Sequence, residues 1–316
     1  MPVDLAAIRV AHDRIRPHIH RTPVLSSARL DVASGASLFF KCENFQKVGA
    51  FKARGATNAV FALDDETARR GVATHSSGNH AAALSRAAKL RGIAAHIVMP
   101  SNSPKVKVRA VEGYGGRIVF CEPNQRARED TCARVIADTG ATLIHPFENE
   151  DVMAGQGTIA VELLEDVPDL DVVLCPVGGG GVLCGTAVAA KSLRPSIKVI
   201  ATEPAGADDA AQSFHEHRLI YQEKKNTIAD GLRTNLGAPN FALVQQYVDD
   251  VVTVSDESII AAMRAIWETM KIVVEASGAV PYAAIVEGKV DCRSKRVGII
   301  LTGGNVDLDA LPWRKF

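Results

Sequence analysis

Residues 71–100 have the sequence GVATHSSGNHAAALSRAAKLRGIAAHIVMP, in which a short strand pattern alternates with a helical pattern. Residues 72–75 are β-prone, residues 79–91 form an Ala- and Leu-rich helical run that ends at Gly92, and residues 94–99 form a second strand. Gly just past a run with basic residues in its last turn is typical of a helix end. Strands alternating with helices of this length predict βαβ units and a parallel sheet.

The same alternation continues on both sides of this stretch. Further strands are expected at residues 38–42, 117–121, 141–145, 171–177, 198–202, 251–254 and 296–301. Further helices are expected at residues 4–16, 51–63, 104–112, 125–138, 154–165, 182–193, 256–271 and 278–288. We therefore predict an α/β fold with two open, twisted, mostly parallel sheets. A small domain (71–147) is expected to be inserted in a large domain (1–70 and 148–316), since single cores stop growing near roughly 250–300 residues.

The bulk composition excludes several classes of protein. Lys+Arg and Asp+Glu both total 36, so the zero net charge argues against a nucleic-acid or membrane partner. The six Cys form no CxxC pair, which indicates buried thiols in a reducing compartment. No signal peptide is visible at the start, so a cytoplasmic location is expected. Residues 172–190 carry no charge, but Pro176 and four glycines predict a strand, a loop and a helix there instead of a membrane span.

Lys52 is the candidate reactive residue. It follows the apolar strand at 38–42 and a glycine turn, and it stands at the start of a helical run. Burial and the positive end of a helix both lower the pKa of a lysine amine, which is a nucleophile only when deprotonated. Such an amine can form a Schiff base with an aldehyde such as pyridoxal phosphate. The alternative interpretation is a surface lysine at a helix N-terminus.

A run of glycines at 178–181 follows one strand and opens a helix. Free N–H groups and the helix dipole make this loop a candidate phosphate site, and the alternative is a flexible turn. Together with Glu203 after the next strand, it also imitates a dinucleotide site. However, the run does not match G-x-G-x-x-G, because position 183 is Leu.

Three other strand ends carry candidate ligand groups. Residues 76–80 (SSGNH) place hydroxyls and free N–H groups at a helix start, which suits a carboxylate, although plain helix capping is an alternative. Thr302 and two glycines follow the strand at 296–301, where parallel sheets bind ligands. Carboxylates cluster at 203–209, and oxygen ligands of this type suit Mg²⁺ or Ca²⁺ unless they form only a solvated helix start.

Taken together, these ordered motifs resemble the serine/threonine dehydratase and serine racemase family of fold type II pyridoxal-phosphate enzymes. The resemblance runs from Arg21-Thr22-Pro23 to Asn305 and implies a tryptophan synthase β-like architecture. It implies that Lys52 is the Schiff-base lysine, that Phe51 packs by the cofactor, and that Asn79 binds the 3′-oxygen of the cofactor. The expected phosphate loop is Gly178, Gly179, Gly180, Gly181 and Val182, and Thr302 is expected to face the pyridine nitrogen.

The resemblance also assigns the substrate and metal residues. The substrate carboxylate is expected to contact Ser76, Ser77, Gly78, Asn79 and His80. In the racemase branch Ser77 is a second catalytic acid/base. A divalent cation, Mg²⁺, Mn²⁺ or Ca²⁺, is expected on Glu203, the carbonyl of Ala207 and Asp209. A homodimer and a small amino-acid substrate are also expected.

These residues favour elimination. A threonine opposite the ring nitrogen supplies no charge to keep it protonated, so the ring is a weaker electron sink and loss of a β-substituent is favoured. We expect a dehydratase (ammonia-lyase) acting on a 3-hydroxy amino acid. The first candidate is 3-hydroxyaspartate, because Arg233 and Asn235 offer donors for a second carboxylate, unless Arg233 faces solvent. The next candidates are L-threonine and L-serine. A serine or aspartate racemase is the alternative, and a nicotinamide-dependent oxidoreductase is a remote one.

Overall fold

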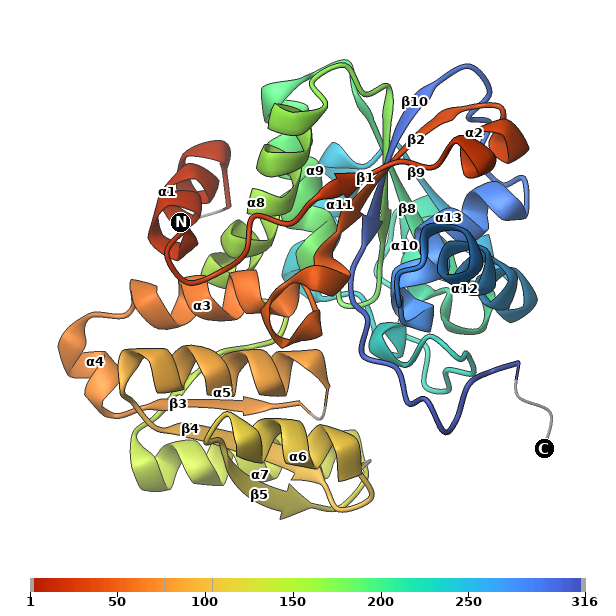
Figure 1. The fold of residues 1–316 in the computed structure, drawn as a ribbon. Coiled ribbons are helices and arrows are strands. Elements are labelled where there is room, and N and C mark those ends of the chain that lie inside the picture. The colour runs from red at the N-terminus through yellow and green to blue at the C-terminus, as the bar shows by residue number, and fades with distance from the viewer. Residues whose placement is uncertain (1–2, 77, 104, 314–316) are drawn as a thin grey trace.

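The structure is a computed structural model that describes residues 3–76, 78–103 and 105–313 (Figure 1). Its larger sheet has the strand order β1-β2-β10-β7-β8-β9, and only the β1–β2 pair is antiparallel. The strands are β1 (Val24–Leu25), β2 (Ser37–Cys42), β7 (Val172–Pro176), β8 (Lys198–Pro204), β9 (Asp250–Val254) and β10 (Arg296–Leu301). The predicted α/β fold with mostly parallel sheets is confirmed.

Helices cover both faces of the larger sheet because its strands alternate their apolar side chains. Val173 and Cys175 pack against one group of helices, and Val172 and Leu174 pack against the other. The first group is α1 (Leu5–Ile15), α8 (Glu150–Asp166), α9 (Gly181–Leu193), α10 (Asp209–Glu216) and α11 (Ala238–Tyr247). The second group is α2 (Ala28–Ser34), α12 (Asp256–Met270) and α13 (Ala276–Val286).

The smaller sheet has the order β5-β4-β3-β6, and its strands are parallel. The strands are β3 (Val72–His75), β4 (Ala95–Pro100), β5 (Arg117–Cys121) and β6 (Thr142–Leu143). Helices α5 (Asn79–Arg91) and α6 (Lys105–Gly113) pack on the face with Val72 and Ile97, and α7 (Gln125–Thr139) packs on the face with Ala73 and Val98. The βαβ units predicted from residues 71–100 are therefore present.

Helix α3 (Lys52–Ala62), followed by α4 (Asp65–Arg69), lies between the two sheets (Figure 1). Ala59 and Val60 of α3 share an apolar core with the smaller sheet, as does Val152 of α8. Elements of both parts of the chain therefore contribute to this core, and the domain boundaries at 71 and 147 stay a prediction.

The main differences from the sequence-based expectations lie between residues 205 and 247. This stretch contains α10, where a helix start was only the alternative to a metal site, and α11, where no helix was expected. Helix α11 has little apolar periodicity of its own, and it is held by Phe241 and Val244 against the core around α9. These two helices form because of tertiary packing, which contributes most of the stability of short helices. Helix α8 also starts earlier than expected, because the Asn149 side chain caps its first turn.

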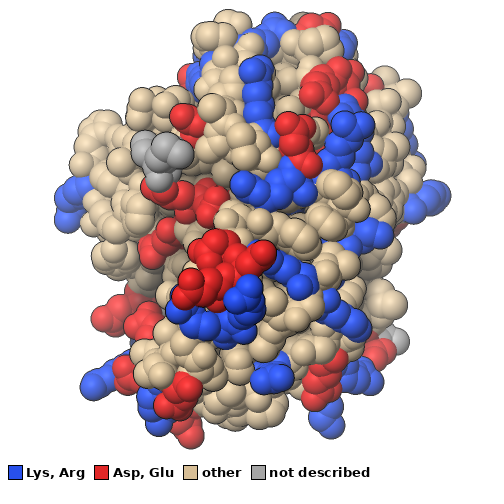
Figure 2. Space-filling view, turned by 90° about the vertical axis from the view of Figure 1, so that its left-hand side faces the viewer, with Lys and Arg blue, Asp and Glu red and all other residues tan. Residues whose placement is uncertain are grey.

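The surface and the cysteines agree with the composition. Acidic and basic side chains are interspersed on the face in Figure 2. All six cysteines are free. In the part of the chain that the structure describes, no helix is long and apolar enough to cross a membrane. The uncharged residues 172–190 form β7, a loop and α9, as predicted.

Candidate active site

Lys52 begins α3, and its side chain is partly buried. The backbone N–H of Phe51 donates to the carbonyl of Thr302 at 2.9 Å, which joins the start of α3 to the end of β10. The Lys52 amine donates to the carbonyl of Pro146 at 2.8 Å and lies 5.1 Å from the centre of the Phe51 ring. Burial lowers the pKa of Lys52 to about 8. A substantial fraction of this amine is therefore neutral near pH 8, as a nucleophile or base requires.

The segment after β6 connects Lys52 to the glycine loop. Pro146 accepts from Lys52, and the ring of the next residue, Phe147, packs on Gly179, where a Cβ would overlap the ring. Gly180 has φ = 94°, a conformation that favours glycine. Packing and backbone conformation thus require two of the glycines, and the N–H groups that open α9 remain without a partner inside the helix. The loop keeps the donor geometry that a phosphate needs.

His80 and His145 lie near Lys52 on the side of the smaller sheet, and His75 packs against His145. Burial lowers the pKa of His80 to about 3, and burial, with His75 and Lys52 nearby, lowers that of His145 to about 4. One ring nitrogen of His80 contacts the carbonyl of Ile144 at 3.1 Å, and its buried Nδ1 has no partner among the described residues. A neutral His80 therefore keeps one ring nitrogen available to a bound molecule.

The expected carboxylate loop is described except for Ser77, which lies outside the described residues. The Ser76 hydroxyl accepts weakly from the N–H of Gly78 at 3.4 Å, and Asn79 begins α5. Residues 76 and 78–80 therefore lie at the carboxyl end of β3 and the N-terminus of α5. This end of the helix favours an anion.

Asn79 is held by two residues of the larger sheet's part of the chain. Its amide donates to Glu275 at 3.0 Å, and its oxygen accepts from Asn305 at 2.9 Å. Glu275 precedes α13, and its backbone N–H donates to the carbonyl of Gly303, next to Thr302. Thr302 is itself buried. These contacts bring Asn79, Glu275 and Thr302 to the end of β10 where Lys52 begins its helix.

Glu275→Gln is expected to change how stability depends on pH. Burial, with Asp230 nearby, raises the pKa of Glu275 from 4.5 to about 7, so the folded state favours the protonated carboxyl. Its stabilising contribution is complete below about pH 4.5 and is lost as the pH rises through about 7. Between about pH 5.5 and pH 8.5 the free energy of unfolding, measured in urea, should fall by about 2 kcal/mol more in the wild type than in the variant. An equal loss in both proteins would contradict the assignment.

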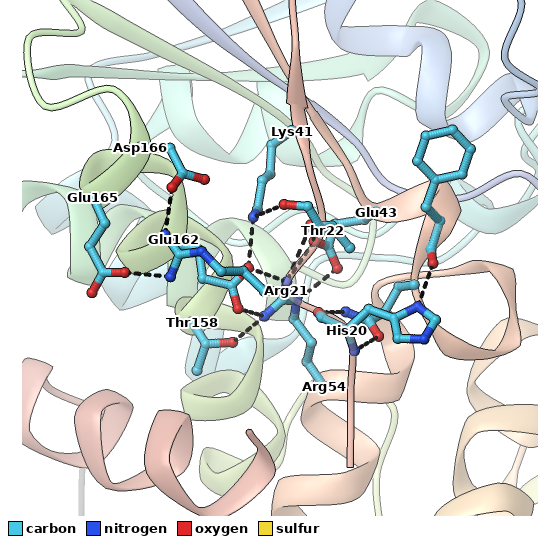
Figure 3. A network of polar contacts seen from close by, with 12 residues as sticks. His20, Arg21, Thr22, Lys41, Glu43, Arg54, Thr158, Glu162, Glu165 and Asp166 are labelled. Carbon is cyan, nitrogen blue, oxygen red and sulfur yellow. Dashed lines mark hydrogen bonds and ion pairs between the residues drawn. The ribbon is translucent and has the colours of Figure 1, made fainter. Parts of the chain in front are cut away.

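A buried charge cluster fixes the other side of α3 (Figure 3). Arg54, two residues after Lys52, donates to Glu43 and to Glu162, both at 2.7 Å. Lys41 of β2 donates to Glu162 at 2.6 Å and to the carbonyl of Thr22 at 2.7 Å. Two cations and two carboxylates thus balance one another in the interior, and they join β2, α3 and α8.

Glu203 and Asp209, two of the three expected metal residues, lie near each other, but a lysine contacts Asp209. The Glu203 carboxylate lies near the start of α10, where it accepts hydrogen bonds from the N–H groups of Ala210 and Ala211. Asp209 contacts the amine of Lys225. Ala207, two residues before Asp209 in the sequence, is buried. The residues present therefore do not fit a divalent cation while the Lys225 ammonium occupies Asp209.

Arg233 and Asn235 contact their own loop. The Arg233 guanidinium is exposed and donates to the carbonyl of Thr227 at 2.8 Å, while the Asn235 side chain accepts from the N–H of Gln222 at 2.9 Å. Thr234 between them lies against Gly178, where a Cβ would come within 2.9 Å of its hydroxyl. The loop borders the glycine loop, and a second-carboxylate role of these two side chains stays a prediction.

Several site residues were not singled out from the sequence. Pro146, Phe147 and Glu275 line the site, and Lys225 lies at the expected metal position. Glu275 carried a signal, because it is a lone carboxylate between apolar residues 272–274 and a small-residue helix. The others had none, since proline, phenylalanine and surface lysine are common in loops.

The assembled residues fit pyridoxal phosphate. Lys52 supplies a partly buried amine with a lowered pKa, and the start of α9 supplies free N–H donors for a phosphate. Asn79 and Thr302 stand at the end of β10 next to Lys52, with hydrogen-bonding groups that a pyridine ring needs. When bound, this cofactor would withdraw electrons from the α-carbon of an amino acid.

Comparisons with known proteins agree with this fit. A family model described as "Pyridoxal-phosphate dependent enzyme" matches residues 15–303. A serine racemase of Arabidopsis thaliana is 52% identical and covers 99% of this chain and 96% of its own. A beta-hydroxyaspartate dehydratase of Paracoccus denitrificans is 52% identical and covers 96% of each chain. The solved structure of maize serine racemase is 50% identical, with a TM-score of 0.96 over 98% of this chain and 95% of its own. The chain therefore belongs to the pyridoxal-phosphate-dependent enzyme family.

Proposed function

We propose that this enzyme eliminates water from a 3-hydroxy amino acid and releases a 2-keto acid and ammonia. The observation that carries the proposal is the partly buried Lys52 amine, whose pKa is lowered to about 8 at the junction of α3, β10 and the glycine loop. In this proposal Lys52 holds the cofactor and then removes the α-proton of the substrate. The N-terminus of α5 and His80 bind the α-carboxylate and fix the α-carbon near that amine.

The other residues direct the reaction toward elimination. The Thr302 hydroxyl carries no charge, so negative charge at the α-carbon is stabilised less than an aspartate partner would allow. Departure of the β-hydroxyl as the proton leaves is then favoured. Asn79 is held by Glu275 and Asn305, which gives one orientation to its amide. We propose that Asn79 orients the cofactor ring.

The proposed substrate is 3-hydroxyaspartate, with oxaloacetate as the keto acid. The 52% identity to a beta-hydroxyaspartate dehydratase supports it, as does the position of the 232–235 loop beside the glycine loop. L-threonine and L-serine are the next candidates. The test is keto-acid release by the cofactor-loaded protein from L-serine, D-serine, L-threonine and the threo and erythro 3-hydroxyaspartates. Faster turnover of serine or threonine would overturn the substrate assignment.

Arg233→Gln is expected to raise KM for 3-hydroxyaspartate by roughly 10–100-fold and to leave KM for serine unchanged. A hydrogen bond to a charged group is worth about 1.5–3 kcal/mol, and Arg233 would lose its contact with the second carboxylate. Steady-state kinetics on both substrates measures the difference. Arg218→Gln is the matched control, since Arg218 is exposed and pairs with Glu216. Equal changes on both substrates would place Arg233 outside the site.

Racemisation of serine or aspartate is the second candidate. A serine racemase is as similar to this chain as the dehydratase is, at 52% identity. Racemisation needs a second acid/base on the face of the α-carbon opposite Lys52, and Ser77 is the residue proposed for it. The nicotinamide-dependent alternative is set aside, because the chain belongs to the pyridoxal-phosphate family.

Ser77→Ala is expected to remove racemisation and to spare elimination from one enantiomer. The reason is that Lys52 alone can remove the α-proton from one face, whereas reprotonation on the other face needs the serine. Chiral chromatography of serine and a keto-acid assay on the same samples separate the two activities. Ser37→Ala, which changes an exposed serine at the start of β2, is the control. Equal loss of both activities in the Ser77 variant would show that the two-base assignment is wrong.

A further inference from the structure

The carboxylates of Glu203 and Asp209 already have a cation beside them. The Lys225 amine contacts Asp209 Oδ1, and the side chains are only 7% and 0% exposed. The other Asp209 oxygen accepts from the backbone N–H of Leu236 at 2.7 Å. The two Glu203 oxygens accept from the N–H groups of Ala210 and Ala211 at 3.2 and 2.9 Å. Every oxygen of both carboxylates thus has a donor from the chain itself.

The segment that carries Lys225 is fixed on both sides of it. The N–H of Asn226 donates to the carbonyl of Gly206 at 2.8 Å, and the N–H of Ile220 donates to the Ser213 hydroxyl at 2.9 Å. Gly206 belongs to η3 (Ala205–Ala207), which lies between Glu203 and Asp209 in the sequence. The backbone therefore holds the ammonium against Asp209.

Charge and ligand number both disfavour a divalent cation in this arrangement. Adding an ion of charge +2 to Lys225 and two carboxylates would leave a net positive charge in the interior, which is costly. Ca²⁺ takes six to eight oxygen ligands, and Mg²⁺ requires a near-octahedral set. Among the described residues, no group of three or more His, Cys, Asp and Glu side chains is placed to hold a metal ion.

We propose that the Lys225 ammonium is the resident cation of this site and takes the place of a divalent metal. It ties the segment before residue 226 to the turn between β8 and α10. A divalent cation can enter only when the ammonium is absent, because both need Asp209. This inference concerns stability and metal binding, so it does not depend on which substrate the enzyme uses.

The test compares wild type, Lys225→Met and Lys224→Met, all loaded with cofactor. Methionine keeps much of the length of the lysine stem but not its charge, and Lys224 is the exposed neighbouring control. Thermal unfolding is measured in EDTA and in MnCl₂, and bound Mn²⁺ is counted by electron paramagnetic resonance. Wild type and Lys224→Met should have the same Tm in both buffers and bind no stoichiometric Mn²⁺.

Lys225→Met should unfold roughly 5–10 °C lower in EDTA, because a buried carboxylate has lost its partner. It should recover part of this loss in MnCl₂ and bind one Mn²⁺ per chain. One Mn²⁺ per chain in the wild type would overturn the proposal, and this measurement stands even if the variant fails to fold. An unchanged Tm of the variant in EDTA would also overturn it. A lower Tm with no response to Mn²⁺ would show that the ammonium and the metal do not share one site.

Discussion

Lys52→Ala is expected to lower turnover at least about 10²–10⁴-fold, the contribution typical of a general acid–base group, and to abolish it if no other amine replaces Lys52. The physical reason is the position of the amine, since it is partly buried, donates to the carbonyl of Pro146 and has a pKa lowered to about 8. The alanine side chain has no amine, so it can neither hold the cofactor nor accept the α-proton. The measurement is keto-acid release at saturating substrate, together with the visible absorbance of bound cofactor.

Lys89→Ala is the matched control for this prediction. Lys89 is exposed on α5, the helix that carries Asn79, so its removal should leave both rate and absorbance unchanged. Circular dichroism and thermal unfolding would show whether the Lys52 variant keeps its fold. A Lys52→Ala protein that is folded and retains more than about a tenth of the wild-type rate would contradict the assignment of Lys52 as the base.

Arg54→Met is expected to destabilise the protein by about 3–5 kcal/mol, the cost of breaking a buried ion pair by removing one partner. Arg54 is 0% exposed and lies between Glu43 and Glu162 (Figure 3). Its removal leaves two buried carboxylates with only Lys41 to balance them. Arg54 and Lys41 together hold the pKa of Glu162 near 2 against the opposing effect of burial, so this carboxyl is charged in the folded state.

Arg21→Met is the control for the charge cluster. Arg21 lies in the same region of Figure 3 and pairs with Glu165 and Asp166, but its side chain is 48% exposed. Exposed pairs contribute about 0–1 kcal/mol, so this variant should unfold in urea almost like the wild type. If both variants lost a similar amount of free energy of unfolding, burial would not be the reason that the Arg54 ion pairs stabilise the protein. Since Arg54 stands two residues after Lys52, a variant that stays folded should also lose activity.

The periodicity of the sequence determined the α/β fold. Strands at 72–75, 117–121 and 296–301 and the helix at 79–91 were predicted with the bounds that the structure has. Strand and helix periods differ, and side chains at the carboxyl ends of parallel strands meet at one edge. The assignment of Lys52, Asn79 and the glycine loop to one site rested on the resemblance to the serine/threonine dehydratase and serine racemase family, and the strand-end rule is consistent with it.

Only the tertiary structure decided the contacts that depend on long-range packing. Glu275 bonds Asn79 across 196 positions of the chain, and Lys41 bonds Glu162 across 121. No local pattern records such a pair, because each partner alone resembles an ordinary surface charge. The same holds for Lys225, which was not singled out from the sequence and which lies against Asp209 in the interior. A buried charge must have a partner, and only the folded chain determines which residue that partner is.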